Sequence, residues 1–389
     1  MFSLPEVSPE MVKPIMFTAV GVFVFFFLLQ VYYYLAYWLP VIRRAGRKLE
    51  YMEAGTEPVS VILYARNQAD EILRNLPIWM EQEYPEYEIV LVNDRSYDES
   101  QDIIISMQAR FPNLRVVDVQ EQDKHPTDRK FAIALGVKAA AHARLLFSHI
   151  DTLPVSKQWI LHMQGAFDGG QEREIVLGYT GCAPFSGLKS SIMQWDALRE
   201  NLRLFGHSIR RRAYAGDGRN MGYLKGLFFF RKGFIAHLKH PSGEDDLFVN
   251  VASTPKNVGI CLHPPAFVHI NGEKSFKWFW NRKLKYVGNR NLYRSGDQSV
   301  LTLWALIPWL VFLTALLGAW SAQVQIPIFW GVVSAFALQL LLRWVLLSVA
   351  MRRFQIPITI LMLPLLDFLY LFLSAAWTIR ASAGRPVDS

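Results

Sequence analysis

A long uncharged segment near the N-terminus restricts this chain to a membrane-attached architecture. Residues 16–39 run MFTAVGVFVFFFLLQVYYYLAYWL. At about 1.5 Å per residue, a helix of this length crosses a hydrocarbon core of about 30 Å. Arg43, Arg44, Arg47 and Lys48 follow a Tyr/Trp cluster, whereas a cleaved signal peptide has a shorter apolar stretch and a small-residue cleavage site. The segment is therefore predicted to be a membrane span that is retained.

Three further apolar runs lie near residues 299–320, 328–350 and 356–377. An apolar fraction of 52% and a mean hydropathy of +0.16 agree with several spans. Basic residues follow the first span, precede the second and separate the third from the fourth, and such flanks lie on the cytoplasmic side. We therefore expect outward-facing termini and a cytoplasmic domain over residues 40–298. The later basic flanks are Arg282, Lys283, Lys285, Arg290 and Arg294, then Arg352 and Arg353.

Two charged side chains fall inside the predicted spans. Arg343 lies in the third and Asp367 in the fourth. An unpaired charge in hydrocarbon is costly, so the two are expected to form an ion pair. Contact with a lipid substrate is the alternative.

The net charge and the number of cysteines exclude few classes of function. A net charge of +8 suits nucleic acid, anionic lipid or a phosphorylated substrate. No recognisable nucleic-acid-binding module accompanies the basic residues, so nucleic acid is not expected as a partner. Cys182 and Cys261 are too few for a disulfide framework.

Short apolar runs alternate with helical patterns in the first half of the domain, which predicts an α/β fold with a largely parallel sheet. No glycine-rich dinucleotide turn follows the first strand, and no P-loop motif occurs. Ligands of such sheets bind at the carboxyl ends of the strands. The predicted strands are 59–65, 88–94, 114–119 and 143–151, and the predicted helices are 67–82, 100–111 and 129–142.

Acidic residues occupy three places suited to chemistry. Asp94 and Asp151 each close a predicted strand, and Glu244-Asp245-Asp246 follows His240-Pro241-Ser242-Gly243. A strand-end carboxylate can accept hydrogen bonds from a ribose or base, or hold a divalent ion. Turn or helix-capping roles are the structural alternative for each of them.

Four blocks together resemble the family 2 inverting glycosyltransferases with a GT-A fold. They are Ala65-Arg66-Asn67 with Gln82-Glu83-Tyr84-Pro85, then Asn93-Asp94-Arg95-Ser96-Tyr97-Asp98, then Lys130 with Phe131-Ala132-Ile133-Ala134-Leu135-Gly136, and Gly218-Arg219-Asn220-Met221-Gly222-Tyr223. The last block is similar to one found in a membrane-attached bacterial branch of that family. The match covers more than half of the chain.

The resemblance implies an inverting hexosyltransferase that uses a nucleotide-sugar, UDP- or GDP-linked, and a lipid or lipid-linked acceptor at the cytoplasmic face of a bacterial inner membrane. Asp245 is the expected general base, with Glu244 and Asp246 open as alternatives. The resemblance further implies three residue groups: Ala65, Arg66, Asn67, Asp94 and Lys130 on the donor side, Gly218, Arg219 and Asn220 on the acceptor side, and Asp151 with His149 at a Mg²⁺ or Mn²⁺ site.

Two departures from the family pattern bear on activity. His149-Ile150-Asp151 stands where the family has Asp-x-Asp, which removes one carboxylate from the metal site. Arg282-Lys283-Leu284-Lys285-Tyr286 stands where processive synthases carry Gln-x-x-Arg-Trp, so a non-processive enzyme is expected. A catalytically degenerate member, binding a nucleotide-sugar or a partner synthase without turnover, is the alternative function.

The expected organisation has five parts. An N-terminal anchor covers residues 1–40, and a GT-A domain covers 41–274. Residues 275–298, aromatic and basic, form either an amphipathic interfacial segment or an ordinary flank of the next span. Three transmembrane helices over 299–378 and a tail over 379–389 complete the chain.

Overall fold

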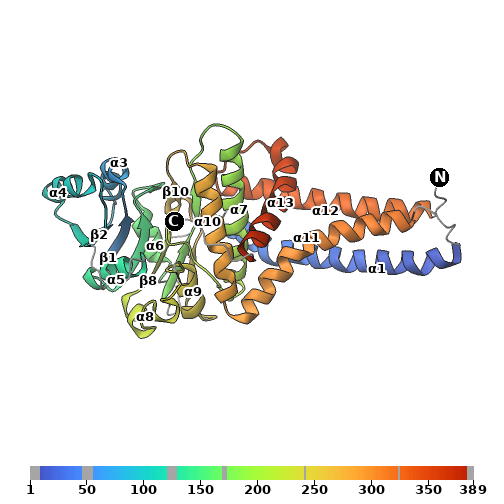
Figure 1. The fold of residues 1–389 in the computed structure, drawn as a ribbon, viewed down its shortest axis with the longest axis horizontal. Coiled ribbons are helices and arrows are strands. Elements are labelled where there is room, and N and C mark those ends of the chain that lie inside the picture. Colours follow the sequence, from blue (N-terminus) through green and yellow to red (C-terminus); the bar gives the residue numbers. More distant parts are fainter. Residues whose placement is uncertain are drawn as a thin grey trace.

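A computed structural model describes residues 9–45, 56–120, 129–168, 173–240, 242–322 and 325–382. An α/β domain forms one end of an elongated molecule, and apolar helices extend from it (Figure 1). The first half of the domain alternates strands and helices as predicted. Its elements are β1 (Val59–Ala65), α3 (Ala69–Trp79), β2 (Tyr87–Asp94), α4 (Ser100–Arg110), β3 (Leu114–Val119), α5 (Arg129–Ala139) and β4 (Arg144–His149).

The main sheet has the strand order β3-β2-β1-β4-β8-β6-β9. Strands β3, β2, β1 and β4 are parallel, β8 is antiparallel to both its neighbours, and β6 pairs parallel with β9. A smaller sheet has the order β5-β10-β7. The additional strands are β5 (Thr152–Pro154), β6 (Ile175–Gly178), β7 (Thr180–Cys182), β8 (Met221–Leu224), β9 (Val258–Cys261) and β10 (Val268–Ile270).

Both faces of the main sheet are buried. Consecutive side chains of a strand point to opposite faces, so Val61 and Leu63 pack into one apolar cluster while Ile62 packs into the other. Helices α3 and α4 cover the first face, and α5 covers the second. The central strands β1 and β4 are largely apolar because neither face meets water, whereas the edge strand β3 exposes Arg115 and Asp118.

Two helices lie between the sheet and the membrane helices, α7 (Leu188–Ile209) and α10 (Phe276–Asn289) (Figure 1). Ser275 caps the N-terminus of α10: its side-chain oxygen accepts a hydrogen bond from the backbone N–H of Trp278. The remaining helices of the domain are short: α6 (Trp159–Gly165), α8 (Lys225–Phe230) and α9 (Asp246–Ala252).

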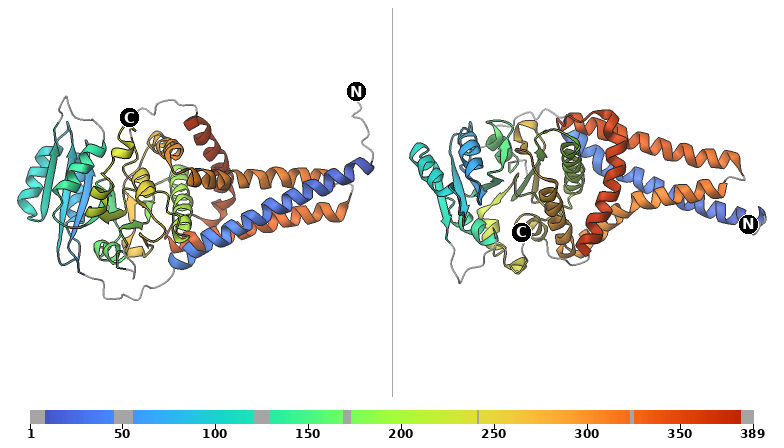
Figure 2. Two further views of the ribbon diagram at one scale, coloured as in Figure 1. Left: turned by 90° about the horizontal axis from the view of Figure 1, so that it is seen from below. Right: turned by 45° about the horizontal axis from the view of Figure 1, so that its top comes forward.

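Four helical segments are long and apolar enough to cross a membrane, as the sequence predicted. Helix α1 (Pro9–Tyr33), continued by a π-helical turn (Tyr34–Trp38) and α2 (Leu39–Ala45), runs beside α11 (Ser295–Ser321) and α12 (Ile326–Arg353). The fourth, α13 (Leu363–Ser382), crosses the domain-side end of this bundle and packs against α10 and α7 (Figures 1 and 2). Its C-terminal end therefore lies beside the domain, whereas the sequence predicted that both termini face outward.

The predicted ion pair between Arg343 and Asp367 is present. A second arginine, Arg199 of α7, also contacts the same carboxylate, with Nη1 2.7 Å from Oδ1 of Asp367. The sequence did not predict this contact, because Arg199 lies in the domain. Asp367 therefore connects the crossing helix to both the bundle and the domain.

Candidate active site

The first site carboxylate ends strand β2. Asp94 is fully buried, and its Oδ2 accepts a hydrogen bond of 2.7 Å from the Tyr64 hydroxyl. Its Oδ1 lies 2.6 Å from Nη2 of Arg95. Asp94 is thus fixed at the carboxyl edge of the sheet, where the sequence placed it.

The donor-side motif residues join two neighbouring loops. The backbone N–H of Asn67 donates to Oγ of Ser96 at 2.9 Å, and Oδ1 of Asn67 accepts from Tyr97 N at 2.8 Å. Asn67 has a φ of 50°, a left-handed conformation that asparagine tolerates. Ala65 is buried at the end of β1 and Arg66 is exposed. The motif therefore shapes the edge around Asp94.

Arg129, at the start of α5, joins the parts of the site and was not predicted. Its guanidinium lies 4.0 Å from the ring centre of Tyr64, a cation–π contact. Its Nε lies 3.2 Å from Oε1 of Glu244, and its Nη2 contacts Nε2 of His149. Burial and the cations Arg129, Arg219 and Arg282 lower the pKa of His149 well below its usual value, so this imidazole is neutral at pH 7.

Asp245 lies at the centre of the acidic run. Its Oδ1 accepts from Asp246 N at 2.8 Å and caps helix α9. Its Oδ2 accepts from Gly218 N at 3.0 Å and from the Tyr286 hydroxyl at 2.8 Å. Burial and the neighbouring Glu244 and Asp217 raise the pKa of Asp245. A carboxylate has about four acceptor positions, so one remains for a substrate proton.

Asp246 is completely buried, and both of its carboxylate oxygens accept hydrogen bonds. Asn289 Nδ2 donates to both of its oxygens, at 3.1 and 3.0 Å, and the Tyr293 hydroxyl donates to Oδ2 at 2.7 Å. Burial and Asp245 raise the pKa of Asp246 to about 8. These contacts tie α9 to α10 and leave no oxygen for a substrate.

Asp151 follows β4 and lies among cations. Arg219 Nε is 3.7 Å from its Oδ1, and Lys274 Nζ is 3.7 Å from its Oδ2. Arg282 lies close by and pairs with Asp217, 3.1 Å from Nη2 to Oδ2. This arrangement favours a polyanion such as a diphosphate.

The fit of a divalent ion depends on His149 and Asp151. Among the described residues, no three His, Cys, Asp or Glu side chains are grouped to hold a metal. Nδ1 of His149 lies 3.9 Å from Oδ1 of Asp151, and this buried oxygen accepts no hydrogen bond within the described part of the chain. Mg²⁺ bound with a nucleotide needs only one or two protein ligands, because phosphates and water complete its shell. The two residues therefore fit such an ion.

Two of the predicted site residues are buried, and their side chains hold neighbouring segments of the chain together. Lys130 is buried and donates to the His240 carbonyl, which links α5 to the segment before Glu244. Asn220 is also buried: its Nδ2 donates to the Tyr179 and Ala266 carbonyls, both at 2.8 Å. Asn220 holds the loop that carries Gly218 and Arg219, but it has almost no surface to offer an acceptor.

The second group that the sequence did not identify lies on α10 and the turn after it. Arg282, Tyr286, Asn289 and Tyr293 contact the carboxylates Asp217, Asp245 and Asp246. The spacing of four and three residues puts Arg282, Tyr286 and Asn289 on one face of α10, and Tyr293 follows in the next turn. This polar stripe was the available sequence signal.

Comparison with known proteins identifies the class. The sequence model of glycosyl transferase family 21 matches residues 22–381. No curated protein shows a significant sequence match. Among solved structures, the mannosyltransferase PcManGT from Pyrobaculum calidifontis, in complex with GDP-Man and Mn²⁺, is 16% identical, with 89% of this chain and 99% of that chain covered and a TM-score of 0.50. Residues 1–349 of S. aureus TarS are 17% identical, with 60% and 65% covered and a TM-score of 0.41.

The family match confirms the prediction of a glycosyltransferase, and the likeness to PcManGT confirms the GT-A fold. The family whose model matches is family 21, whereas the motif resemblance named family 2. The match extends from the first apolar helix to the last, so it includes the membrane helices as well as the α/β domain. The chain belongs to glycosyl transferase family 21.

Proposed function

We propose that this enzyme transfers a sugar from a nucleotide-sugar to a lipid or lipid-linked acceptor, with inversion and without processivity. The observation that carries the proposal is the position of Asp245. Its carboxylate lies beside Gly218 and His149, next to the cations around Asp151. An inverting transfer needs one base for the acceptor hydroxyl and positive charge for the departing diphosphate.

The contacts of the acidic run support Asp245 as the base. Glu244 is paired with Arg129, 3.2 Å from Nε to Oε1. Asp246 has both oxygens occupied by Asn289 and Tyr293. Asp245 retains an acceptor position, and its raised pKa makes it a stronger base.

The donor would lie along the carboxyl edge of the sheet. Asp94, with Ala65, Arg66 and Asn67 around it, would accept hydrogen bonds from the nucleoside. Lys274 and Arg282 would face the diphosphate. Asp151 and His149 would hold Mg²⁺ or Mn²⁺, which would neutralise charge on the leaving group. The GDP-Man and Mn²⁺ bound to PcManGT support a nucleotide-linked donor and a divalent ion. A UDP- or GDP-linked sugar is the donor that the motif resemblance implies.

The membrane helices support a lipid acceptor and a cytoplasmic domain. Arg43, Arg44, Arg352 and Arg353 all lie at the domain-side ends of α2 and α12. Such basic ends face the cytoplasm, here of a bacterial inner membrane.

Gly218 and Arg219 lie between Asp245 and Asp151 and would face the acceptor side.

A second function, binding of a nucleotide-sugar or of a partner synthase without turnover, is favoured by one observation. The cavity that Tyr64, His149, Glu244 and Asp245 line has a volume of only about 20 Å³, and Arg129 contacts three of these side chains. Transfer would then require Arg129 to move.

Transfer into membrane lipid distinguishes the two functions. The full-length protein is incubated with a lipid extract, Mg²⁺ or Mn²⁺, and radiolabelled UDP- or GDP-sugars tested one at a time. We expect label from one donor to enter the organic phase. Binding of a nucleotide without any transfer, across donors and lipids, would support the degenerate function.

A further inference from the structure

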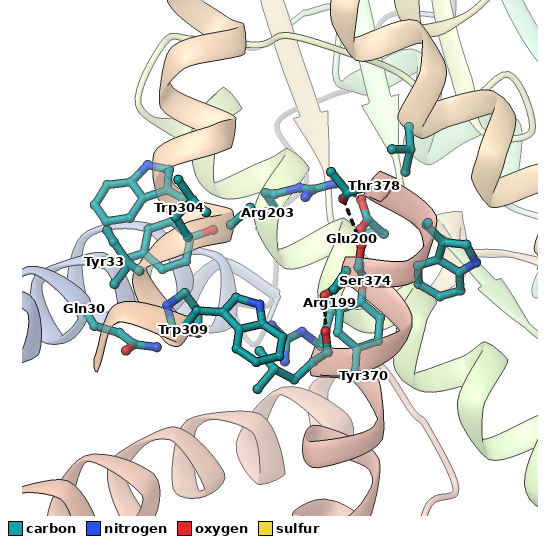
Figure 3. A pocket seen from close by; sticks show the side chains of 18 of the residues that line it. Gln30, Tyr33, Arg199, Glu200, Arg203, Trp304, Trp309, Tyr370, Ser374 and Thr378 are labelled. Carbon is teal, nitrogen blue, oxygen red and sulfur yellow. Dashed lines mark hydrogen bonds and ion pairs between the residues drawn. The ribbon is translucent and has the colours of Figure 1, made fainter. Parts of the chain in front are cut away.

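A cavity of about 270 Å³ lies where the membrane helices meet the domain. None of the residues assigned to the proposed transfer lines it. Its walls come from α1, α11 and α12 on the membrane side and from α7, α10 and α13 on the domain side. Figure 3 shows Tyr33 and Trp304 on one side, Glu200 and Thr378 on the other, and Arg203 between them.

The depth of the cavity matches the headgroup region of a bilayer. It is lined by the last turn of α1, the third and fourth turns of α11, and Arg343 about three turns before the end of α12. Aromatic residues, which favour the membrane interface, are concentrated here. They are Tyr33, Tyr34, Trp38, Trp304, Trp309, Tyr370 and Trp377.

The charges around the cavity are unbalanced. Five cations line it, whereas the ion pairs of the described residues give them only three carboxylates, Asp196, Glu200 and Asp367. Glu200 is shared by three of the cations, and Asp367 by two. Buried charges require partners, so two positive charges remain to be neutralised. The five cations are Arg199, Arg203, Lys283, Arg290 and Arg343.

The rim of the cavity is apolar. Leu306 and Ile379 both line it and are 51% and 71% exposed. An amphiphile could therefore place a charged head inside and its chains along these side chains. The volume lies below the roughly 300–1,000 Å³ of sites for drug-sized ligands, which suits a compact head.

We propose that this cavity binds a phosphate-bearing anion, for which the headgroup of an anionic phospholipid is the source that the apolar rim favours. The site differs from the acidic cluster of the proposed transfer. Lys283, Val287 and Arg290 line the cavity, whereas Tyr286 and Asn289 on another face of α10 contact Asp245 and Asp246. The proposal therefore does not depend on the proposed catalytic function.

Thermal unfolding of the full-length protein in a neutral detergent tests the site with three probes. The probes are phosphatidylglycerol, diacylglycerol with the same chains, and glycerol phosphate. Comparing them distinguishes binding of the acyl chains from binding of the phosphate group. We expect phosphatidylglycerol to raise the unfolding midpoint by about 3 °C or more, because a ligand of the folded state stabilises it, and diacylglycerol to have no effect. An equal shift with glycerol phosphate would identify a soluble phosphate as the source. No difference between phosphatidylglycerol and diacylglycerol, with no effect of glycerol phosphate, would overturn the proposal.

A double variant, Arg203→Gln with Arg290→Gln, removes the two excess charges. It should lose the response to phosphatidylglycerol, whereas Arg43→Gln, an exposed arginine beside the membrane but outside the cavity, should keep it. A wild-type response in the double variant contradicts the site. If that variant fails to fold, quenching of wild-type tryptophan by brominated phosphatidylglycerol decides. Saturable quenching that unlabelled phosphatidylglycerol reverses supports the site, and quenching equal to that by brominated diacylglycerol overturns it.

Discussion

At the scale of single residues, Asp246 illustrates how burial changes the chemistry of a carboxyl group. The sequence shows three consecutive acids, and only the structure distinguishes one that is fully enclosed by Asn289 and Tyr293 from one that retains an open oxygen. Local sequence can predict a helix cap, and Asp245 is one. It cannot predict which carboxylate α10 covers, because α10 lies more than 30 residues further along the chain.

The first prediction concerns the pH dependence of stability. The pKa of Asp246 rises from 3.8 to about 8 on folding, so the folded state binds this proton more tightly. Its contribution to stability is complete below about pH 4 and is lost as the pH rises through 8. Asp246→Asn mimics the neutral acid, so its unfolding midpoint should fall less between pH 5 and pH 9 than that of the wild type. The exposed Asp102→Asn should keep the wild-type slope. Equal slopes in wild type and Asp246→Asn would refute the assignment.

The second prediction concerns Asp94. Asp94→Ala removes the directed acceptors at the end of β2, so the affinity for the nucleotide should fall about tenfold or more, since a hydrogen bond to a charged group contributes about 1.5–3 kcal/mol. Titration calorimetry with UDP and GDP measures this. Tyr64→Phe, which keeps the carboxylate and removes only its hydroxyl partner, is the matched control and should bind more tightly than Asp94→Ala. Unchanged affinity in a folded Asp94→Ala protein would remove Asp94 from the site.

At the scale of elements, the predicted strands and helices of the first half match β1 to β4 and α3 to α5 within a few residues. This half could be predicted because each apolar run is six to eight residues long and alternates with a helical pattern. Strands such as β5 and β10 have three residues each and pair across more than 100 positions of the chain. No local pattern identifies such a pairing.

Helix α10 carries site residues that the sequence did not identify. Its aromatic and basic residues favoured an interfacial or membrane-flanking role, and that interpretation remains untested. The stripe of Arg282, Tyr286, Asn289 and Tyr293 reaches the acidic run from the other side. Its helical spacing was visible in the sequence, but its partners were not.

The third prediction follows from the bond between Tyr286 and Asp245. A hydrogen bond to a carboxylate favours the charged form and lowers its pKa. Tyr286→Phe removes the donor at 2.8 Å, so the pKa of Asp245 should rise further, and the acidic limb of the kcat profile should move to higher pH. The affinity for the donor should stay unchanged. Trp280→Phe, on the same helix and outside these contacts, is the control. A profile that does not move would mean that Asp245 does not titrate in catalysis.

At the scale of the whole molecule, the domain and the membrane helices are joined through charged residues as well as apolar ones. Hydropathy and the cost of buried charge predicted the spans and the pairing of Arg343 with Asp367. They could not predict that α13 crosses the bundle, because composition fixes whether a helix can enter a membrane and not which helices it packs against.

The fourth prediction tests this junction. Asp367→Leu leaves both Arg199 and Arg343 without their shared carboxylate, and breaking a buried pair costs about 3–5 kcal/mol. Arg343→Leu should cost less, because Asp367 keeps Arg199 at 2.7 Å. Adding Arg343→Leu to Asp367→Leu should restore part of the loss. Unfolding midpoints in detergent rank the three variants by loss of stability. Equal losses in the two single variants would contradict the conclusion that both arginines share the Asp367 carboxylate.

The fifth prediction concerns the proposed role of Asp245 as the general base of a sugar transfer, and Asp245→Asn is the variant that tests it. Asparagine caps a helix about as well as aspartate, so the unfolding midpoint and the affinity for the donor should remain near wild type. A general base contributes about 10²- to 10⁴-fold in rate, so the initial rate at saturating donor should fall by that factor. Glu244→Gln and Asp246→Asn should retain far more activity. The rate should therefore fall while stability is kept, and near-wild-type turnover in a folded Asp245→Asn enzyme would show that Asp245 is not the base.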